Sequence, residues 1–361
     1  MSFLQKYIPK INIDWYLLLP SVFLVLLGIS VLYNFNSENL FAERQSIWLA
    51  ISVVIFILFS QLDYSFLKNS RFLMTLFFVT FASLIAVLAL GESVKGAQSR
   101  FYVFGLAIQP ADPAALVLIA FLAKYFSRRH MQIAYIKHIL LSGIYALMFF
   151  LPVAAQPDLG SALMIASVWF FIILLSGISK KHLVLLLSGV LTFAGLAWVF
   201  ILKDYQKDRI LIFLDPLKDL YGAGYNAYQS LVAVGSGQLL GKGIGAGTQS
   251  SLHFLPEYQT DFIFAAFAEE WGFLGSIILF ALFFALIFRI IYIGVKSQDN
   301  FVRLFSIGAG ALFLTHFIVN IGMNIGLLPI TGITLPFFSY GGSHLITEFM
   351  ILGFLSSMSR R

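Results

Sequence analysis

The run from Phe262 to Tyr292 reads FIFAAFAEEWGFLGSIILFALFFALIFRIIY, and Glu269, Glu270 and Arg289 are its only charged residues. A helix needs about 20 apolar residues to cross a bilayer, so this run is long enough to do so. Other apolar runs follow the same pattern along the chain. Their number and spacing are therefore the main guide to the fold.

The composition places the whole chain in a membrane. Of its 361 residues, 60% are apolar and 11% are charged, whereas soluble domains have roughly 25% charged residues. The 23 basic and 17 acidic residues are too few to cover a water-soluble globule of this size. A soluble enzyme, a disordered chain and a nucleic-acid-binding domain are excluded as the main architecture, despite the net charge of +6. The chain has no cysteine, which excludes disulfides and thiolate metal sites.

Ten apolar runs are predicted to form membrane-spanning helices. They begin at Trp15, Ile47, Phe72, Asp112, His138, Ser161, His182, Phe262, Phe301 and Ser339. The first run is too long for a signal-peptide core and lacks a small-residue cleavage site, so we expect it to be retained. An even number of spans puts both termini on one side. The sequence therefore predicts an all-α polytopic membrane protein with a single integral-membrane domain over residues 1–361.

Lysine and arginine indicate which side that is. With both termini in the cytoplasm, 15 of the 23 basic residues lie inside, in agreement with the excess of Lys and Arg in short cytoplasmic loops. Five of the eight outer ones lie in one long extracytoplasmic loop, about residues 203–261. Long loops translocate largely regardless of charge. Most of the acids lie on the outer side, so we expect any chemistry to face outward.

The long outer loop contains a glycine-rich stretch, Gly235-Ser-Gly-Gln-Leu-Leu-Gly-Lys-Gly-Ile-Gly-Ala-Gly247. It is neither a Walker loop nor a dinucleotide fingerprint, because a glycine follows Lys242 and the glycine spacing is wrong. Two interpretations stay open. Either the stretch is a tightly folded loop, or its backbone N–H groups approach a phosphate.

Asp261 lies at the outer water–lipid boundary, where the long apolar run begins. One interpretation is that its carboxylate balances the dipole of the first helical turn. The other is that aromatic surroundings raise its pKa so that it can act as a general base.

Glu269 and Glu270 are expected to lie deeper in the membrane. They follow Asp261 by eight and nine residues, or about 12 Å along a helix. A carboxylate at that depth needs a partner or water and is a functional-site hypothesis by default. His316 and Arg100 are the candidate partners on other segments.

Three further polar segments resemble the one around Asp261. Asp112 and Asp158 each begin an apolar helix, the first after Gln109-Pro and the second after Gln156-Pro. The uncharged stretch from Gly326 to His344 is rich in proline and glycine. Such backbone is tolerated at membrane depth only where protein buries it or where it lines a wet cavity. Four such segments at one membrane face indicate a site.

The loop motifs resemble a known family. The run from Gly247 to Ala265, the Gln156-Pro-Asp-Leu-Gly-Ser161 run and the Pro329–Ser343 run are similar to those of the SEDS (shape, elongation, division and sporulation) proteins. Gly247-Thr-Gln-Ser250 is more similar to the rod-shape members than to the division members. The resemblance implies a glycosyltransferase of the bacterial inner membrane that polymerises lipid II into β-1,4 glycan strands on the outer face for cell elongation and rod shape.

The resemblance also implies site residues and partners. Asp261 matches the aspartate thought to be catalytic in the family. A class B penicillin-binding protein that crosslinks the strands, and other elongation-complex membrane proteins, are the implied partners. The candidate substrate-binding residues are Arg100, Arg209, Lys242, Gln249, Glu257, Thr260, Asp158 and Ser343. A divalent cation, Mg²⁺ or Mn²⁺, would be shared between Asp261 and the diphosphate, because no all-carboxylate cage is visible. No nucleic acid or organic cofactor is expected.

One motif departs from the family pattern. The usual Gln-Pro-Ser-Glu-x-x-Lys reads Gln109-Pro-Ala-Asp-Pro-Ala-Ala115 here. The acid is shortened to Asp112 and the lysine one turn later is lost. Asp112 would then need another cation, and Arg100 and Lys95 are the candidates.

Two other functions remain possible from the sequence. A transporter that flips the same lipid would also contain many helices and buried acids, although transporters bind their substrates near the midplane. A scaffold without chemistry, organising the crosslinking partner, is the third. Polymer formation in detergent, without a membrane gradient, distinguishes the enzyme from both.

Overall fold

The computed structural model describes residues 13–33, 40–94, 97–103, 106–128, 135–200, 202, 204–215, 219, 222–252 and 254–360. Its elements are α1 (Trp15–Tyr33), α2 (Leu40–Gln61), the 3-10 helix η2 (Tyr64–Lys68), α3 (Ser70–Leu90), β1 (Glu92–Val94), β2 (Ala97–Val103), β3 (Leu106–Ile108), α4 (Ala111–Ser127), α5 (Ile136–Ala155), α6 (Leu159–Leu175), α7 (Lys180–Phe200), α8 (Asp204–Leu214), α9 (Ala223–Ser236), α10 (Thr248–Ser251), α11 (Ile263–Lys296), α12 (Asn300–Asn324) and α13 (Gly342–Met358).

Each of the ten predicted apolar runs forms a helix, namely α1 to α7 and α11 to α13. In the described part of the chain, seven of these are long and apolar enough to cross a membrane: α1, α2, α3, α5, α7, α11 and α12. The other three, α4, α6 and α13, are 17 residues each. The protein is an α-helical membrane protein, while the count of ten crossings and the orientation of the termini stay predictions.

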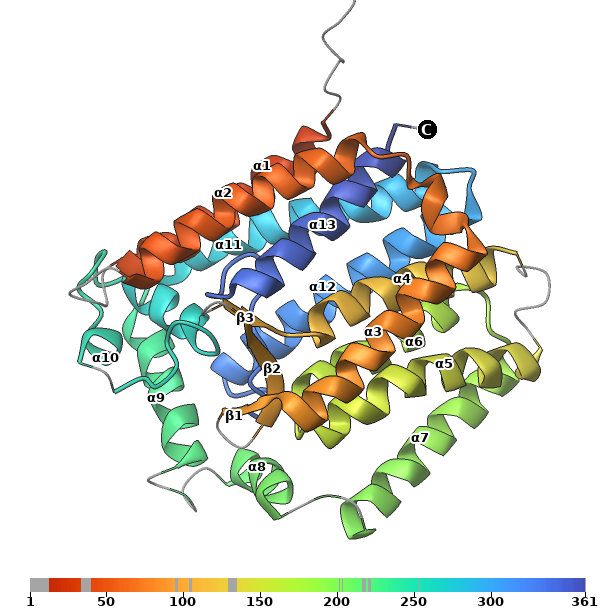
Figure 1. Cartoon of the computed structure of the whole chain (residues 1–361). Helices are drawn as coiled ribbons and strands as arrows, with labels where there is room; N and C mark the ends of the chain where they lie inside the picture. Colours follow the sequence, from red (N-terminus) through yellow and green to blue (C-terminus); the bar gives the residue numbers. More distant parts are fainter. Residues whose placement is uncertain are drawn as a thin grey trace, which may run out of the picture.

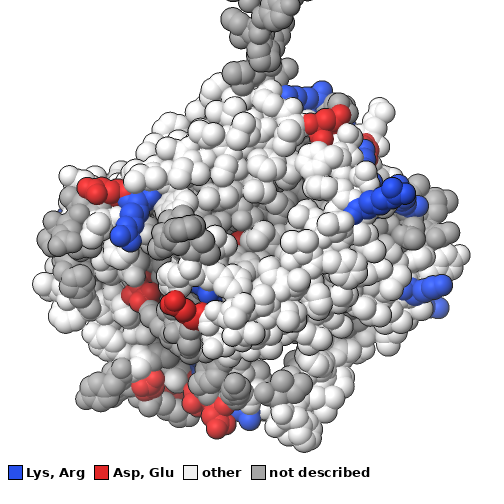
Figure 2. All heavy atoms as spheres, in the orientation of Figure 1, with Lys and Arg blue, Asp and Glu red and all other residues white. Residues whose placement is uncertain are grey.

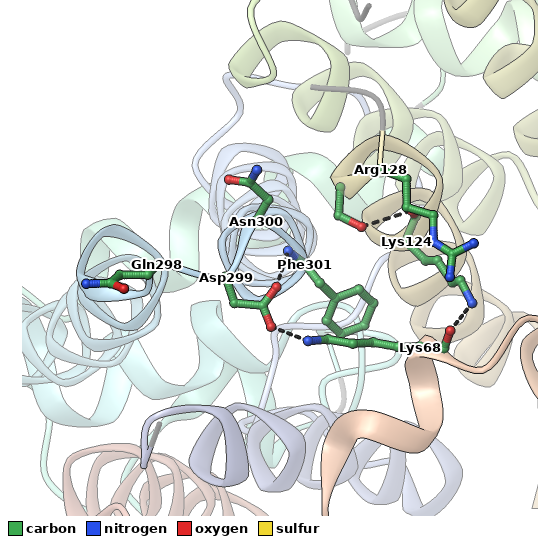
Figure 3. Close-up of a pocket in the computed structure, with 8 residues that line it drawn as sticks. Lys68, Lys124, Arg128, Gln298, Asp299, Asn300 and Phe301 are labelled. Atoms are coloured by element: carbon green, nitrogen blue, oxygen red, sulfur yellow. Dashed lines mark hydrogen bonds and ion pairs between the residues drawn. The ribbon is translucent and has the colours of Figure 1, made fainter. Parts of the chain in front are cut away.

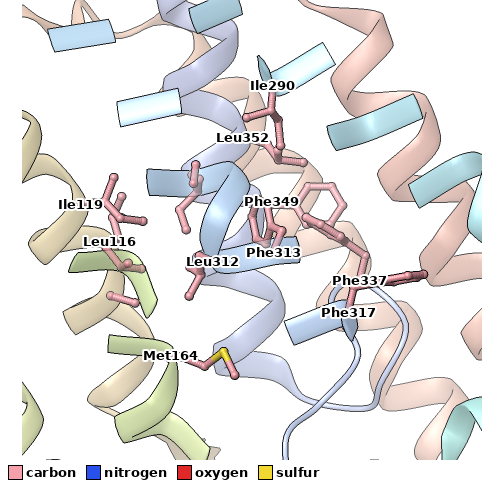
Figure 4. Packing of buried hydrophobic residues seen from close by; sticks show 14 of the residues in the cluster. Leu116, Ile119, Met164, Ile290, Leu312, Phe313, Phe317, Phe337, Phe349 and Leu352 are labelled. Atoms are coloured by element: carbon pink, nitrogen blue, oxygen red, sulfur yellow. The ribbon is translucent and has the colours of Figure 1, made fainter. Parts of the chain in front are cut away.

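The helices form a bundle with α12 at its centre. In α12, 78% of the most apolar stretch is buried inside the protein, whereas none of the corresponding stretch of α7 is. Figure 4 shows Leu312 and Phe313 of α12 among side chains from α4, α6, α11 and α13. In Figure 1, α7 lies at the edge of the bundle. Because most of α12 is buried, the polar groups on its buried faces must find partners within the protein.

Charged side chains gather toward the two ends of this bundle. In Figure 2 a broad band without charges separates them, as expected for a surface that faces lipid tails. The sheet and α8 to α10 lie at one end of the bundle, and the C-terminus lies at the other (Figure 1).

Two segments are more ordered than the sequence predicted. The segment Gly91–Gln109, which was predicted to lie outside, contains a three-stranded antiparallel sheet in the order β1-β2-β3, with Tyr102 paired to Ala107. Aromatic and β-branched residues such as Phe101, Tyr102 and Val103 favour strands. The long segment 203–261, predicted as a loop, contains α8, α9 and α10. The fold is thus helical with a small added sheet.

Helix α11 is interrupted at Gly272. This residue has φ 66° and ψ −163°, a conformation open to glycine but not to residues with a side chain. A Cβ at Gly272 would overlap the backbone of Gly241, and one at Gly237 would overlap the carbonyl oxygen of Ala268. The absence of side chains at these glycines lets the glycine-rich stretch lie directly against the backbone of α11.

Candidate active site

A tight turn places Asp261 at the start of α11. The carbonyl oxygen of Glu257 accepts the backbone N–H groups of Thr260 and Asp261, both at 3.1 Å, and of Phe262 at 3.3 Å. Glu257 itself has φ 50°. Burial, and to a smaller extent the negative charge of Glu257, raises the pKa of the adjacent Tyr258, so its phenol stays neutral. Asp261 is half-buried, at the boundary between this turn and the helix.

Two buried asparagines of α12 fix the backbone of Asp261 from within the bundle. The side-chain amides of Asn320 and Asn324 donate to the Asp261 carbonyl oxygen at 3.1 and 3.0 Å. The Asn320 amide also donates to the carbonyl of Ile333 at 2.7 Å, and the Asn324 oxygen accepts the N–H of Ala265 at 3.1 Å. Both asparagines have no exposed surface. The position of Asp261 is thus determined by two fully buried side chains of a largely buried helix.

The proline- and glycine-rich segment 326–341 lies against the same turn. The hydroxyl of Ser339 donates to the Thr260 carbonyl at 2.7 Å, and the N–H of Tyr340 donates to the Gln259 carbonyl at 2.9 Å. A Cβ on Gly332 would lie 3.6 Å from Oδ2 of Asp261. The predicted convergence of this segment with the Asp261 segment is confirmed.

The beginning of α6 joins this cluster through Gly160, whose Cβ position lies 3.0 Å from the carbonyl oxygen of Thr331. Asp158 caps α6, accepting the Ser161 N–H at 3.0 Å. Gln109 donates to Asp158 at 3.1 Å and accepts from Nε of Arg100 at 3.3 Å. A hydrogen-bonded chain thus runs from an exposed guanidinium on β2 to the edge of the segment that lies beside Asp261.

Glu269 and Glu270 hold the glycine-rich stretch. Lys242 donates to the Glu269 carboxylate at 2.7 Å, and Glu269 also accepts from the Thr248 hydroxyl and the Gln249 N–H, each at 3.1 Å. The N–H of Gly245 donates to Glu270 at 3.1 Å. The prediction that His316 or Arg100 is the partner was wrong, because the partner of Glu269 comes from the glycine-rich stretch itself.

These contacts favour the tightly folded interpretation of that stretch. The N–H groups of Lys242 and Gly243 donate to the carbonyls of Glu269 and Glu270 at 3.0 and 3.1 Å. Those carbonyls are available because Gly272 interrupts the helical bonding of α11. The N–H groups are therefore engaged by the protein itself.

Asp112 has its side-chain partners on α13. Nδ1 of His344 lies 3.1 Å from one Asp112 oxygen, and the Ser343 hydroxyl donates to the other at 3.0 Å. On its far side, Nε2 of His344 lies 3.0 Å from the carboxylate of Glu348. The prediction of Arg100 as this partner was wrong, because Arg100 bonds Gln109. The prediction of Lys95 is untested, because Lys95 lies outside the described residues. The sequence signal for His344 was its place at the start of the last helix, one turn before Glu348.

The remaining predicted substrate residues, Arg209, Thr260 and Glu257, differ in how close they lie to Asp261. Arg209 is exposed on α8, and among the described residues no contact joins it to the Asp261 cluster. Thr260 and Glu257 contribute backbone carbonyls to that cluster. The described residues contain no group of three or more His, Asp or Glu side chains that could hold a metal. The substrate and cation roles stay predictions.

The chain matches the FtsW/RodA/SpoVE family, described as cell cycle proteins, over residues 11–361. It belongs to this family. It is 35% identical over 358 residues to the peptidoglycan glycosyltransferase MrdB of Escherichia coli K12, covering 98% of this chain and 95% of that one. It is also 34% identical over 331 residues to the stage V sporulation protein E of Bacillus subtilis, covering 91% and 89%.

Solved structures of similar proteins have the same fold. One, from work on the structural coordination of polymerization and crosslinking by a peptidoglycan synthase complex, has a TM-score of 0.83 at 30% identity, covering 96% of this chain and 98% of that one. The rod shape determining protein RodA of Thermus thermophilus has a TM-score of 0.73 at 27% identity, covering 97% and 98%. The resemblance to the SEDS family is thereby confirmed over nearly the full length.

Within this SEDS chain, His344 is expected to compensate for the lysine lost at Ala115. Replacing His344 with Ala leaves the carboxylates of Asp112 and Glu348 without their imidazole, at an expected cost of about 1–3 kcal/mol in unfolding free energy. The measurement is thermal unfolding of the purified protein in detergent. Asp112→Asn in the same background should recover part of the loss, because a neutral amide tolerates the vacancy better. If the stability loss of the double variant equals the sum of the losses of the two single variants, Asp112 and His344 do not interact.

Proposed function

We propose that this chain is a peptidoglycan glycosyltransferase that polymerises lipid II during cell elongation, in the bacterial inner membrane with its active face outward. The observation that carries the proposal is Asp261, half-buried at the end of the bundle where three irregular segments meet, with its backbone held by Asn320 and Asn324. The 35% identity to a peptidoglycan glycosyltransferase of E. coli supports the chemistry. The fold shared with a rod shape determining protein supports the elongation role.

The chemistry is a single inverting displacement. The 4-hydroxyl of the GlcNAc of lipid II attacks the anomeric carbon of the growing strand, forming a β-1,4 bond as the α-linked bond to the lipid diphosphate breaks. Asp261 accepts the hydroxyl proton, and the departing diphosphate carries away the bonding electron pair. A fixed backbone keeps the carboxylate in place for this transfer, which removes part of the entropic barrier.

Positive charge for the diphosphate comes from the outer end of the bundle. Arg100 is exposed on β2 and is joined through Gln109 to Asp158. These bonds support a role for the Arg100 guanidinium in stabilising the negative charge that develops on the leaving group. Lys242 is less suited to this role, because its ammonium is already paired with Glu269.

A divalent cation would be held by Asp261 together with diphosphate oxygens. One carboxylate plus substrate phosphates is a typical ligand set for Mg²⁺, which would neutralise charge on the leaving group. The test is chelation followed by separate addition of Mg²⁺ and Mn²⁺. A polymerisation rate unchanged by the chelator would reject the cation and leave the role of Asp261 as a base intact.

The decisive experiment tests whether the purified protein polymerises purified lipid II in detergent. Glycan strands detected after gel separation are expected, without any membrane gradient. A class B penicillin-binding protein is the proposed partner, and its addition should increase the yield. Failure to form strands even with that partner, together with movement of lipid II across vesicle bilayers, would instead favour the transporter.

A further inference from the structure

A polar cavity lies at the end of the bundle opposite Asp261. Its volume is about 310 Å³, and its lining residues are Lys68, Lys124, Ser127, Arg128, Gln298, Asp299, Asn300 and Phe301. Helix α4 begins beside the site at Asp112 and ends at this cavity, which places the two at opposite ends of the same helix. Figure 3 shows that the cavity forms where η2, the end of α4 and the start of α12 meet.

The lining has more positive than negative charge. Lys68, Lys124 and Arg128 are basic, and Asp299 is the one acid among the lining residues. Burial acts to raise the pKa of Asp299, but hydrogen bonds from Lys68 and the Phe301 N–H outweigh it and lower that pKa. Asp299 is therefore ionised at neutral pH and balances Lys68, with which it forms an ion pair. Lys124 and Arg128 are left without an opposite charge among the described residues.

Lys124 is the buried one of these two residues, with only 9% of its surface exposed. Its ammonium donates to the carbonyl of Lys68 and to the hydroxyl of Ser70. A lysine ammonium has three N–H donors, so one remains after these two bonds. Both of its partners are neutral, and a buried cation without a counter-ion is costly.

Arg128 makes that imbalance larger. It follows Lys124 by four residues, a spacing at which like charges on a helix repel each other. Figure 3 shows its guanidinium near the Lys124 ammonium, and the two side chains interact electrostatically. The neighbouring side-chain amides of Gln298 and Asn300 add neutral hydrogen-bond donors. The arrangement is thus suited to an anion with several acceptor oxygens.

We propose that this cavity binds a phosphate-bearing anion between Lys124 and Arg128. The phosphate could come from the headgroup of an anionic phospholipid or from phosphate in water. Basic pockets between helices on the cytoplasmic side bind anionic headgroups, and the predicted topology places this end there. The proposal is independent of the reaction at Asp261, because it concerns different residues at the other end of the bundle.

The test is thermal unfolding of the purified full chain in a neutral detergent. Short-chain phosphatidylglycerol, short-chain phosphatidylcholine, sodium phosphate and sodium chloride at matched ionic strength are titrated separately. We expect the unfolding midpoint to rise with phosphatidylglycerol, with phosphate, or with both, beyond the respective phosphatidylcholine and chloride controls. A rise with the lipid alone identifies a headgroup, and a rise with phosphate alone identifies a soluble anion.

Arg128→Gln is the main variant, since its exposed side chain has no hydrogen bond to the described residues and its loss should leave the fold intact. It should weaken the apparent affinity by about tenfold, the effect of losing one charge-assisted hydrogen bond. Lys181→Gln removes an exposed cation at the same end of the bundle but outside the cavity, and should respond like the unaltered chain. The proposal is overturned if neither anion stabilises the protein beyond its control, or if Arg128→Gln and Lys181→Gln respond equally.

Discussion

Asp261→Asn should reduce glycan polymerisation from lipid II by about 10²–10⁴-fold, the usual contribution of a general base. The amide has nearly the size of the carboxylate but cannot accept the proton of the sugar hydroxyl. The fold should be retained, because the contacts from Asn320 and Asn324 are to the Asp261 backbone, which the substitution leaves in place. The rate of strand formation in detergent is the measurement.

Asp204→Asn is the matched control for that loss. It makes the same change of acid to amide in an exposed residue of α8, outside the Asp261 cluster, and should polymerise at the unaltered rate. An unchanged unfolding midpoint for both variants would show that lost activity is not lost structure. Near-normal strand formation by Asp261→Asn would reject the assignment of Asp261 as the base.

Lys242→Met should cause the largest loss of stability among the substitutions considered. Glu269 has no exposed surface, and the substitution removes the ammonium that lies 2.7 Å from its carboxylate. Removing one partner of a buried ion pair costs about 3–5 kcal/mol. We expect the lower end, because the Lys242 side chain is 29% exposed and the two hydrogen bonds from Thr248 and Gln249 to Glu269 remain. Thermal unfolding measures the loss.

Combining Lys242→Met with Glu269→Gln should restore most of that stability, because the buried charge is removed together with its partner. The same double variant separates two roles of Lys242. If Lys242 only holds the glycine-rich stretch, the double variant should polymerise lipid II once it folds. If Lys242 also binds the diphosphate, the double variant should be folded but inactive. Purely additive losses of stability would show that the pair does not interact.

The helices and the position of Asp261 could be predicted from the sequence because both depend on local patterns. An apolar run of sufficient length forms a helix in a membrane whatever it contacts, and each of the ten runs does so. The convergence of the Asp261 turn with the segment before α13 was also predictable, because irregular backbone must be buried by protein at that depth.

The pairing of charges could not be predicted in the same way. Lys242 and Glu269 are 27 residues apart, and Asp112 and His344 are 232 apart. Their contact depends on the interruption of α11 at Gly272 and on the packing of α13 beside α4, neither of which has a local signal. The sheet was missed for a related reason, since β1 and β3 have three residues each, which is too short a pattern to recognise.

The hydrogen bonds from Asn320 and Asn324 have a consequence for how such proteins can diverge. Asp261 is held in position by hydrogen bonds from a central helix. The segment around α8, which precedes its turn in the chain, therefore contributes little to its position. Insertions, deletions and exchanges around α8, before α9 and the glycine-rich stretch, could therefore accumulate in a lineage while the reacting carboxylate stays in register. That segment is then free to evolve toward different partners, and mutations that affect the chemistry should instead be selected against on α12.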